Sequence, residues 1–145
     1  MAQNDGLVAK LNGLIRGIEF AMLTTIRPNG TLHSCPMATS EVDSDGVLWF
    51  FTANNTEKVE AVKTDARVNL AYSDATGQRY ISITGNAEPV RDHLKAKELW
   101  SSRFQAWFPM GLQDPNLILL RVVIRGVEYW DTTAGRMTPL PGFAR

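Results

Sequence analysis

Short runs of β-branched and aromatic residues, separated by turn signals, constrain the fold of this chain more than any other feature. Residues of these types favour strands, whereas Gly, Pro, Asn and Asp between them favour turns. The expected strands cover residues 17–26, 32–42, 47–53, 66–74, 78–90 and 117–131. Most follow one another without a crossover helix, which favours antiparallel pairing over βαβ units. The sequence therefore predicts a mainly β protein, a six-stranded antiparallel barrel with short helices.

Two of the expected strands differ in their apolar pattern. In residues 66–74, Val68, Leu70 and Tyr72 alternate with polar or small residues, which is typical of a strand that buries one face. Residues 47–53 are apolar on both faces, so this strand is expected to be buried. A small barrel fills its own interior, and apolar outer faces therefore need another cover. We expect a second copy of the chain to supply it.

Pro36 lies inside the expected strand at residues 32–42. Proline has no N–H to donate to a β-ladder, so such a strand is interrupted, lies at a sheet edge or carries a bulge. Each arrangement exposes backbone groups that can hydrogen-bond the edge of a planar heterocycle. His33 is a candidate general acid and Cys35 a candidate nucleophile, although a structural histidine and a buried, inert thiol are the commoner roles. A bulge that turns a barrel corner is the alternative for the motif.

Three helices are expected between and before the strands. Apolar residues at helical spacing predict an N-terminal helix over residues 4–16, with Asn4 or Asp5 as its cap. A second, short helix is expected at residues 56–64, and a third at residues 92–108. The third helix would place four aromatic residues on one face: Trp100, Phe104, Trp107 and Phe108.

The chain is expected to form a single domain over residues 1–145, with the barrel at 17–131 and a loose or docked C-terminal extension at 132–145. Its 15 Lys and Arg balance its 15 Asp and Glu, so no global field favours nucleic acid or an anionic membrane. One cysteine and two histidines do not make a usual zinc site, and we expect no metal. The lone thiol and the absence of a secretory or spanning pattern predict a soluble, cytoplasmic protein.

A polar cluster follows the buried strand and opens the second helix. Lys58 falls in the first turn, where the helix dipole disfavours a cation unless an anion is nearby. Free N–H groups at a helix start attract phosphate, and Thr52, Asn54, Asn55 and Thr56 add hydroxyl and amide groups. The pattern predicts an anion site. A plain capped helix with a solvated lysine is the alternative.

Two further groups of residues leave their roles open. The aromatic residues near position 107, together with Trp130, suit either the cover of a flat cofactor or the core. The arginines either pair with carboxylates across a sheet or interface, or one of them reaches a phosphate, and spacing does not decide between these roles. These arginines are Arg67, Arg79, Arg121 and Arg125.

An ordered series of motifs carries a family resemblance over roughly residues 5–138: HSCPM, GVLWFFTANNTEKVEAV, RVNLAYSD, YISITGNAE, WFPMG and DPNLILLRVVIRGVEYWD. With this spacing the chain resembles the general stress protein branch of the pyridoxamine 5′-phosphate oxidase-like, FMN-binding split barrels. The resemblance implies a six-stranded split barrel that forms homodimers, with FMN in grooves at the subunit interface.

The same resemblance implies which residues hold FMN. Ser34, Cys35, Pro36 and Met37 would line the isoalloxazine edge, largely through backbone, and Trp49, Phe50, Phe51 and Thr52 would lie beside the flavin and its ribityl chain. Thr56 and Lys58 match phosphate-binding positions. Trp107 and Phe108 match a partner-subunit segment that closes over the ring, and Trp130 is expected to add to it.

The implied function is FMN binding, with possible electron transfer between FMN and an unidentified small partner. Vitamin B6 phosphate oxidase activity is not expected, because the chain lacks the extra basic residues and the longer C-terminal region of those oxidases. The position of Cys35 is often basic in this branch, so a thiol there leaves one fewer charge for FMN. Two alternatives remain. One is a non-catalytic flavin carrier or sensor, and the other is a dimeric barrel whose groove takes haem, with His33 or His93 as the iron ligand, or another small ligand, or nothing.

Overall fold

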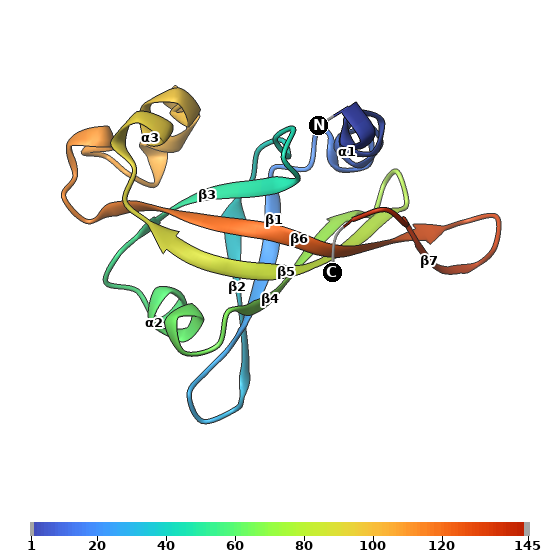
Figure 1. The fold of residues 1–145 in the computed structure, drawn as a ribbon, viewed down its shortest axis with the longest axis horizontal. Coiled ribbons are helices and arrows are strands. Elements are labelled where there is room, and N and C mark those ends of the chain that lie inside the picture. Colours follow the sequence, from blue (N-terminus) through green and yellow to red (C-terminus); the bar gives the residue numbers. More distant parts are fainter. Residues whose placement is uncertain (1, 144–145) are drawn as a thin grey trace.

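The computed structural model describes residues 2–143 as one antiparallel sheet curled into a barrel, with short helices around it (Figure 1). The strands are β1 (Phe20–Ile26), β2 (Leu32–Ala38), β3 (Val47–Ala53), β4 (Arg67–Asp74), β5 (Arg79–Val90), β6 (Leu117–Asp131) and β7 (Arg136–Pro139). The sheet order is β2-β1-β4-β5-β6-β3, and β7 pairs with the outer part of β6. The mainly β split barrel is confirmed, with β7 as a seventh strand inside the expected extension.

The barrel is split because β2 and β3 stand at the two ends of the strand order and do not pair with each other. β2 pairs only with β1, in an unbroken register that sets Pro36 opposite Met22. Of the three arrangements predicted for a strand that contains Pro36, the structure shows the edge position, and the β1–β2 pairing is not interrupted. The strand ends at Ala38, four residues before the expected boundary at residue 42.

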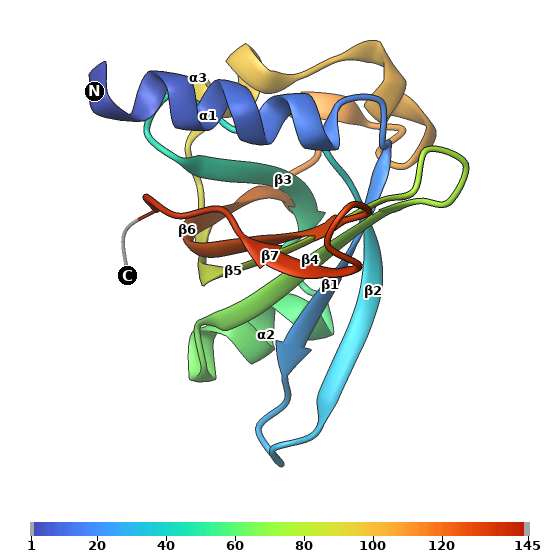
Figure 2. The ribbon, with the colours of Figure 1, turned by 90° about the vertical axis from the view of Figure 1, so that its right-hand side faces the viewer.

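The helices are α1 (Ala2–Ile15), α2 (Glu57–Thr64) and α3 (His93–Leu99), followed by the 3₁₀ turns η1 (Ser102–Ala106) and η2 (Gly111–Gln113). Figures 1 and 2 show α1 and α2 on opposite sides of the sheet, while α3 and its following turns lie near the α1 side. None of the helices in the described residues is both long and apolar enough to cross a membrane.

Two helix predictions were wrong in detail. The first helix already begins at Ala2, so Asn4 and Asp5 lie within it and not at its cap. The helix expected at residues 92–108 ends at Leu99, and the chain re-enters a turn of different geometry at Ser102. The backbone is extended at Trp100 and Ser101, which ends the helix, and the Ser101 side chain accepts a hydrogen bond from the backbone N–H of Arg103 as the N-cap of the new turn.

The barrel interior is filled by side chains from every strand of the main path. Its largest fully buried members are Tyr72, Phe50, Leu23, Leu48, Leu70, Ile83, Leu120, Ile124 and Val122. Val68, Leu70 and Tyr72 all face this interior, which confirms the alternation predicted for the strand. The C-terminal segment is docked on the barrel: Leu140 is buried, and its backbone N–H donates to the Val127 carbonyl at 2.8 Å.

A register shift in the β5–β6 pair changes which residues of β6 face the core. Thr84 lies opposite Gly126 but Gly85 lies opposite Ile124, so Arg125 is the extra residue of a bulge. Before the bulge the even-numbered residues are buried, and after it Val127 is buried. Strict alternation along an unbroken strand would put Arg121, Arg125 and Val127 on one face, and the bulge at Arg125 prevents this.

Candidate ligand-binding site

A pocket of about 270 Å³ lies where the barrel is split. The two strands with a free edge, β2 and β3, each contribute three consecutive residues to its wall. The lining residues are Pro36, Met37 and Ala38 from β2, Phe51, Thr52 and Ala53 from β3, and Phe20, Thr56, Lys58, Phe104, Trp107 and Phe108 from neighbouring segments. Strand edges that lack a neighbour present free backbone N–H and C=O groups. The fold thus places unsatisfied main-chain groups beside a concave, mostly apolar surface.

The start of α2 brings a cation and two hydroxyl groups to this pocket. Lys58 Nζ donates to Thr52 Oγ1 at 3.2 Å, and both residues line the pocket. Thr56 is the N-cap residue, but its hydroxyl donates to the Ala53 carbonyl at 2.8 Å and makes no capping bond. The first-turn N–H groups of α2 are therefore not occupied by the Thr56 side chain, which leaves an anion-attracting helix start next to an ammonium group.

Charges behind this polar wall are arranged around Glu57. The Arg27 guanidinium donates from Nε to Glu57 Oε2 at 2.7 Å and from Nη2 to Oε1 at 3.4 Å. The hydrogen bond from Arg27 lowers the pKa of Glu57, so its carboxylate is ionised near neutral pH. His33 Nε2 lies 3.9 Å from the same carboxylate. Burial raises the pKa of the Cys35 thiol, an effect that the Lys58 charge opposes and the Glu57 charge reinforces.

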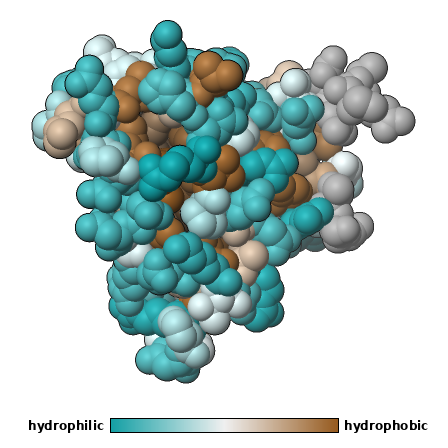
Figure 3. Space-filling view, turned by 60° about the vertical axis from the view of Figure 1, so that its left-hand side comes forward, coloured by the Kyte–Doolittle hydropathy of each residue, from teal (hydrophilic) through white to brown (hydrophobic). Residues whose placement is uncertain are grey.

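Aromatic side chains form another part of the wall. Trp107 and Phe20 meet edge to face, with ring centroids 5.3 Å apart. Phe51 packs against Phe104 at 5.1 Å and against Phe108 at 6.4 Å. Trp107 keeps 48% of its surface exposed. On the face of the molecule drawn in Figure 3, apolar side chains reach the surface between hydrophilic ones. Such a wall suits a flat, apolar ring system.

Eight of the sequence-predicted site residues line this one pocket: Pro36, Met37, Phe51, Thr52, Thr56, Lys58, Trp107 and Phe108. Two others lie on β2 next to it. Ser34 points its hydroxyl to Thr24 Oγ1, 2.7 Å away, and Cys35 packs against the barrel core. In a single chain, Trp107 and Phe108 thus share the pocket with Lys58.

The remaining three predicted residues do not line the pocket within one chain. Phe50 is 1% exposed and belongs to the barrel core. Trp49 donates from Nε1 to Asp43 Oδ2 at 2.9 Å, with Lys95 and Arg121 5.2 and 6.0 Å from its ring. Trp130 stands opposite Met137 in the β6–β7 pair, near the end of β6 that is remote from the pocket.

Four lining residues were not among the predicted site residues: Phe20, Ala38, Ala53 and Phe104. The sequence places Phe104 only among the aromatic residues on one face of the expected third helix. Phe20 is 41% exposed and starts a half-buried strand. An outward-facing aromatic residue at a strand start is a signal that the sequence carried, but its contact with Trp107 arises only from the fold.

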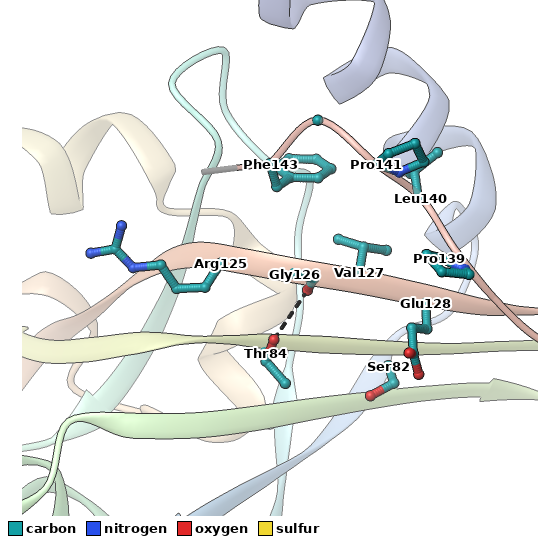
Figure 4. Close-up of a pocket in the computed structure, with 11 residues that line it drawn as sticks. Ser82, Thr84, Arg125, Gly126, Val127, Glu128, Pro139, Leu140, Pro141 and Phe143 are labelled. Carbon is teal, nitrogen blue, oxygen red and sulfur yellow. Dashed lines mark hydrogen bonds between the residues drawn. The ribbon is translucent and has the colours of Figure 1, made fainter. Parts of the chain in front are cut away.

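A second cavity of about 360 Å³ lies between β5, β6 and the C-terminal segment (Figure 4). Its wall contains none of the predicted site residues. The Arg125 side chain donates from Nε to Asn86 Oδ1 at 2.8 Å and points away from the other labelled residues, while Thr84 Oγ1 donates to the Gly126 carbonyl at 3.4 Å. This cavity is larger, but among the described residues Phe143 is the one aromatic residue in its wall, and its cation, Arg125, is bonded to Asn86. The split-barrel pocket combines Lys58 with several aromatic side chains and is the stronger candidate.

The histidines do not favour haem in the split-barrel pocket. Among the residues that line it there is no histidine, because His33 lies beside Glu57 and His93 lines another cavity. Within residues 2–143, no group of three His, Cys, Asp or Glu side chains is placed to hold a metal ion.

Residues 7–144 match the family described as pyridoxamine 5′-phosphate oxidase like. The chain is 26% identical over 139 residues to protein bli-3 of Neurospora crassa, a match that covers 89% of this chain. The same match spans 66% of the length of that fungal relative.

Solved structures with the same fold include a bacterial stress protein and a flavin-binding one. General Stress Protein 26 of Bacillus anthracis superposes with a TM-score of 0.75 at 22% identity, covering 92% of this chain and 98% of that one. The general stress FMN/FAD binding protein of Xanthomonas citri superposes with a TM-score of 0.73 at 26% identity, covering 94% of each chain.

Proposed function

This chain belongs to the pyridoxamine 5′-phosphate oxidase-like family, and we propose that it is a homodimeric flavoprotein that binds FMN in the split-barrel pocket. The observation that carries the proposal is the composition of that pocket, where Lys58 and Thr52 stand at a helix start within the same wall as Phe20, Trp107 and Phe108. The printed description of the Xanthomonas citri relative, FMN/FAD binding, supports the same ligand class.

The residues present fit the chemistry of FMN. Its phosphate is an anion, and a lysine together with helix N–H groups offers charge-assisted hydrogen bonds, which are stronger than neutral ones. Its ring system is planar and largely apolar, as the aromatic wall requires. Free backbone groups on β2 and β3 are available for the polar edge of the ring. When bound, the flavin supplies the hydride and electron chemistry, and the protein orients it and sets its surroundings.

A second copy of the chain completes the proposal. Phe20 and Met22 on the outer face of β1 are 41% and 42% exposed, and Leu32 on β2 is 68% exposed. Phe20 and Met22 lie at one end of the β1–β2 pair and Leu32 at the other, so exposed apolar side chains occur along the length of this face. Exposed apolar surface of this kind is typical of an interface. We therefore propose that the dimer covers this face beside the pocket. The partner's copy of Trp130 would reach the ring in that arrangement, whereas Trp107 and Phe108 already line the pocket of their own chain.

We propose an oxidoreductase that moves electrons between FMN and a small molecule, rather than a vitamin B6 phosphate oxidase. The alternative is a flavin carrier or sensor with no substrate turnover. Steady oxidation of NADH or NADPH by the purified holoprotein would favour the enzyme, and its absence with a range of acceptors would favour the carrier. Since a reducing compartment suits the free thiol of Cys35, we place the protein in the cytoplasm.

The experiment that tests FMN binding begins with the ligand itself. The purified protein should show flavin absorbance bands near about 375 and 450 nm, and mild denaturation should release a molecule with the mass of FMN. FAD or haem in the released fraction, or no binding when FMN is added, would contradict the proposal. Sedimentation of the same sample should give a dimer.

Lys58→Ala then tests the phosphate contact. We expect FMN affinity to fall by about 1.5–3 kcal/mol, the range for a hydrogen bond to a charged group. Riboflavin, which lacks the phosphate, is the control ligand, and its affinity should be unchanged. Equal FMN affinity in the variant and the original protein, measured by fluorescence quenching, would remove Lys58 from the phosphate site.

A further inference from the structure

We propose that Arg27 is a positioning residue for the phosphate end of the pocket: it binds and neutralises the Glu57 carboxylate, so that the Lys58 ammonium remains available to the ligand. This inference rests on the FMN site proposed above. It concerns a residue outside the lining set, contributed by the turn between β1 and β2.

The site contains an electrostatic conflict that needs such a residue. Glu57 is the first residue of α2, directly between the N-cap Thr56 and Lys58. The positive end of the helix dipole stabilises a carboxylate there as readily as it stabilises a phosphate. An ionised Glu57 without a partner would repel a dianionic phosphate and draw on the same positive field.

Arg27 resolves the conflict by a two-point contact. Its Nε and Nη2 atoms reach the two carboxylate oxygens of Glu57 at 2.7 and 3.4 Å. Lys58, in contrast, is bonded to Thr52 Oγ1 in the pocket wall rather than to the neighbouring carboxylate. Arg27 therefore neutralises the protein's own carboxylate, whereas the Lys58 ammonium faces the pocket.

The turn that carries Arg27 is held in place by several hydrogen bonds. The Arg27 N–H donates to the Thr31 carbonyl at 2.8 Å, and its carbonyl accepts from the Gly30 N–H at 2.8 Å. Asn29 Oδ1 accepts from both the N–H and the hydroxyl of Thr31. Gly30 has a φ of 87°, which glycine adopts without strain. The guanidinium thus extends from a hairpin turn that is fixed by its own hydrogen bonds. Figure 1 shows the backbone of this β1–β2 hairpin beside α2.

The Cys35 thiol lies within reach of the charges on both Lys58 and Glu57. Burial raises its pKa most, the Lys58 charge lowers it, and the Glu57 charge raises it. Both charges therefore reach one point on β2, directly before the lining residue Pro36. Changing the balance between Arg27 and Glu57 should change the potential at the phosphate end of the pocket.

The test measures the affinity of four variants for FMN and riboflavin: Arg27→Gln, Arg27→Lys, Glu57→Gln and the double variant Arg27→Gln/Glu57→Gln. We expect Arg27→Gln to weaken FMN by about three- to tenfold at low salt, because one unpaired carboxylate then faces the phosphate. Arg27→Lys should retain most of the affinity, since the charge is kept. Glu57→Gln should bind FMN at least as tightly as the original protein, and the double variant should recover to within about twofold of it.

Riboflavin separates positioning from loss of structure. Its affinity should stay within about twofold in all four variants, because it carries no phosphate to be repelled. The FMN loss in Arg27→Gln should also shrink as salt is raised. Equal losses for FMN and riboflavin would assign Arg27 a purely structural role and overturn the inference.

Other outcomes overturn it differently. If Glu57→Gln fails to rescue Arg27→Gln, Arg27 contacts the ligand itself rather than acting through Glu57. If Lys58→Ala weakens FMN while Arg27→Gln does not, the FMN site stands and only this inference fails. If the original protein does not bind FMN at all, the proposed function fails, and the affinities of the variants are not needed to show it.

Discussion

Trp107 combines an exposed ring face with a fixed position. It is 48% exposed, yet its ring is held edge-on by Phe20 and follows directly after η1. The anchor of η1 is Phe104, which is 3% exposed and packs against Phe51 on β3. The Trp107 ring is thus held in place through buried Phe104 and does not sit on a free loop. Less side-chain conformational entropy is therefore lost when a ligand stacks on the ring.

Trp107→Ala tests this aromatic wall. We expect the affinities for FMN and for riboflavin to fall together, by about 1–3 kcal/mol, which is typical of a lost stacking contact with a nucleic-acid base. The measurement is flavin fluorescence titration. A loss for FMN alone would contradict a role at the ring.

Trp130→Ala is the matched variant, because Trp130 is also exposed but lies away from the pocket within one chain. Because the proposed dimer brings the partner's Trp130 to the ring, we expect the flavin affinity to fall in this variant as well. An affinity equal to that of the original protein would show that each pocket is built from one chain.

At the scale of elements, the bulge in β6 determines which side chains this long strand sends inward. The extra residue, Arg125, moves the buried positions from the even to the odd numbers, so that Val127 joins the core after Ile124. The β5 residue at the shift is Gly85, where the backbones approach closely. A Cβ built there would lie 2.5 Å from the Val123 carbonyl oxygen and 2.9 Å from a Val122 methyl group.

Gly85→Ala should therefore destabilise the barrel. We expect a loss of at least about 2 kcal/mol in the free energy of unfolding, because the obstructing atom is backbone and cannot turn aside. Urea unfolding followed by circular dichroism measures it. Gly13→Ala in α1 is the control, since nothing lies within 4 Å of the added methyl group, and it should stabilise by up to about 1 kcal/mol. Equal stability of Gly85→Ala and the original protein would refute the close approach.

For the whole molecule, the barrel interior is apolar except for a few satisfied polar groups. Tyr72 is 1% exposed, and its hydroxyl is 2.8 Å from Thr39 Oγ1. Burial raises the pKa of Tyr72 to about 12, an effect that the hydrogen bond from Thr39 partly opposes. Its neutral form is thus favoured by the folded barrel, whereas in the unfolded chain a tyrosine titrates near about 10.

The free energy of unfolding should therefore decrease as the pH rises through the alkaline range. Because the folded pKa is the higher one, the contribution of Tyr72 is complete below about pH 10 and is lost as pH rises toward 12. The loss amounts to about 2–3 kcal/mol. Tyr72→Phe should remove this part of the alkaline decline, at a cost of about 1 kcal/mol near neutral pH for the lost hydrogen bond.

Urea unfolding at a series of pH values measures the effect. Tyr80→Phe is the control, because Tyr80 is 37% exposed, and this variant should keep the alkaline slope of the original protein. If Tyr72→Phe showed the same slope as the original protein, the buried phenol would not be its source.

The sequence by itself determined the local features: where strands form, which faces are apolar, and that Lys58 falls in the first turn of a helix that follows a buried strand. These follow from residue type and from periods of two or 3.6, which act over a few neighbours. It also indicated most of the pocket, since Pro36, Thr52, Lys58 and Trp107 were all predicted as site residues and all line it.

Only the tertiary structure decided how these parts meet. It brought the free edges of β2 and β3 together at the split, placed Phe50 in the core and Trp49 beside Asp43, and paired Arg27 with Glu57 across 30 residues. It also inserted the bulge at Arg125, which local alternation does not reveal. The reason is that strand order, register and side-chain packing are settled by contacts between distant segments, and a shift of one residue exchanges the two faces of a strand.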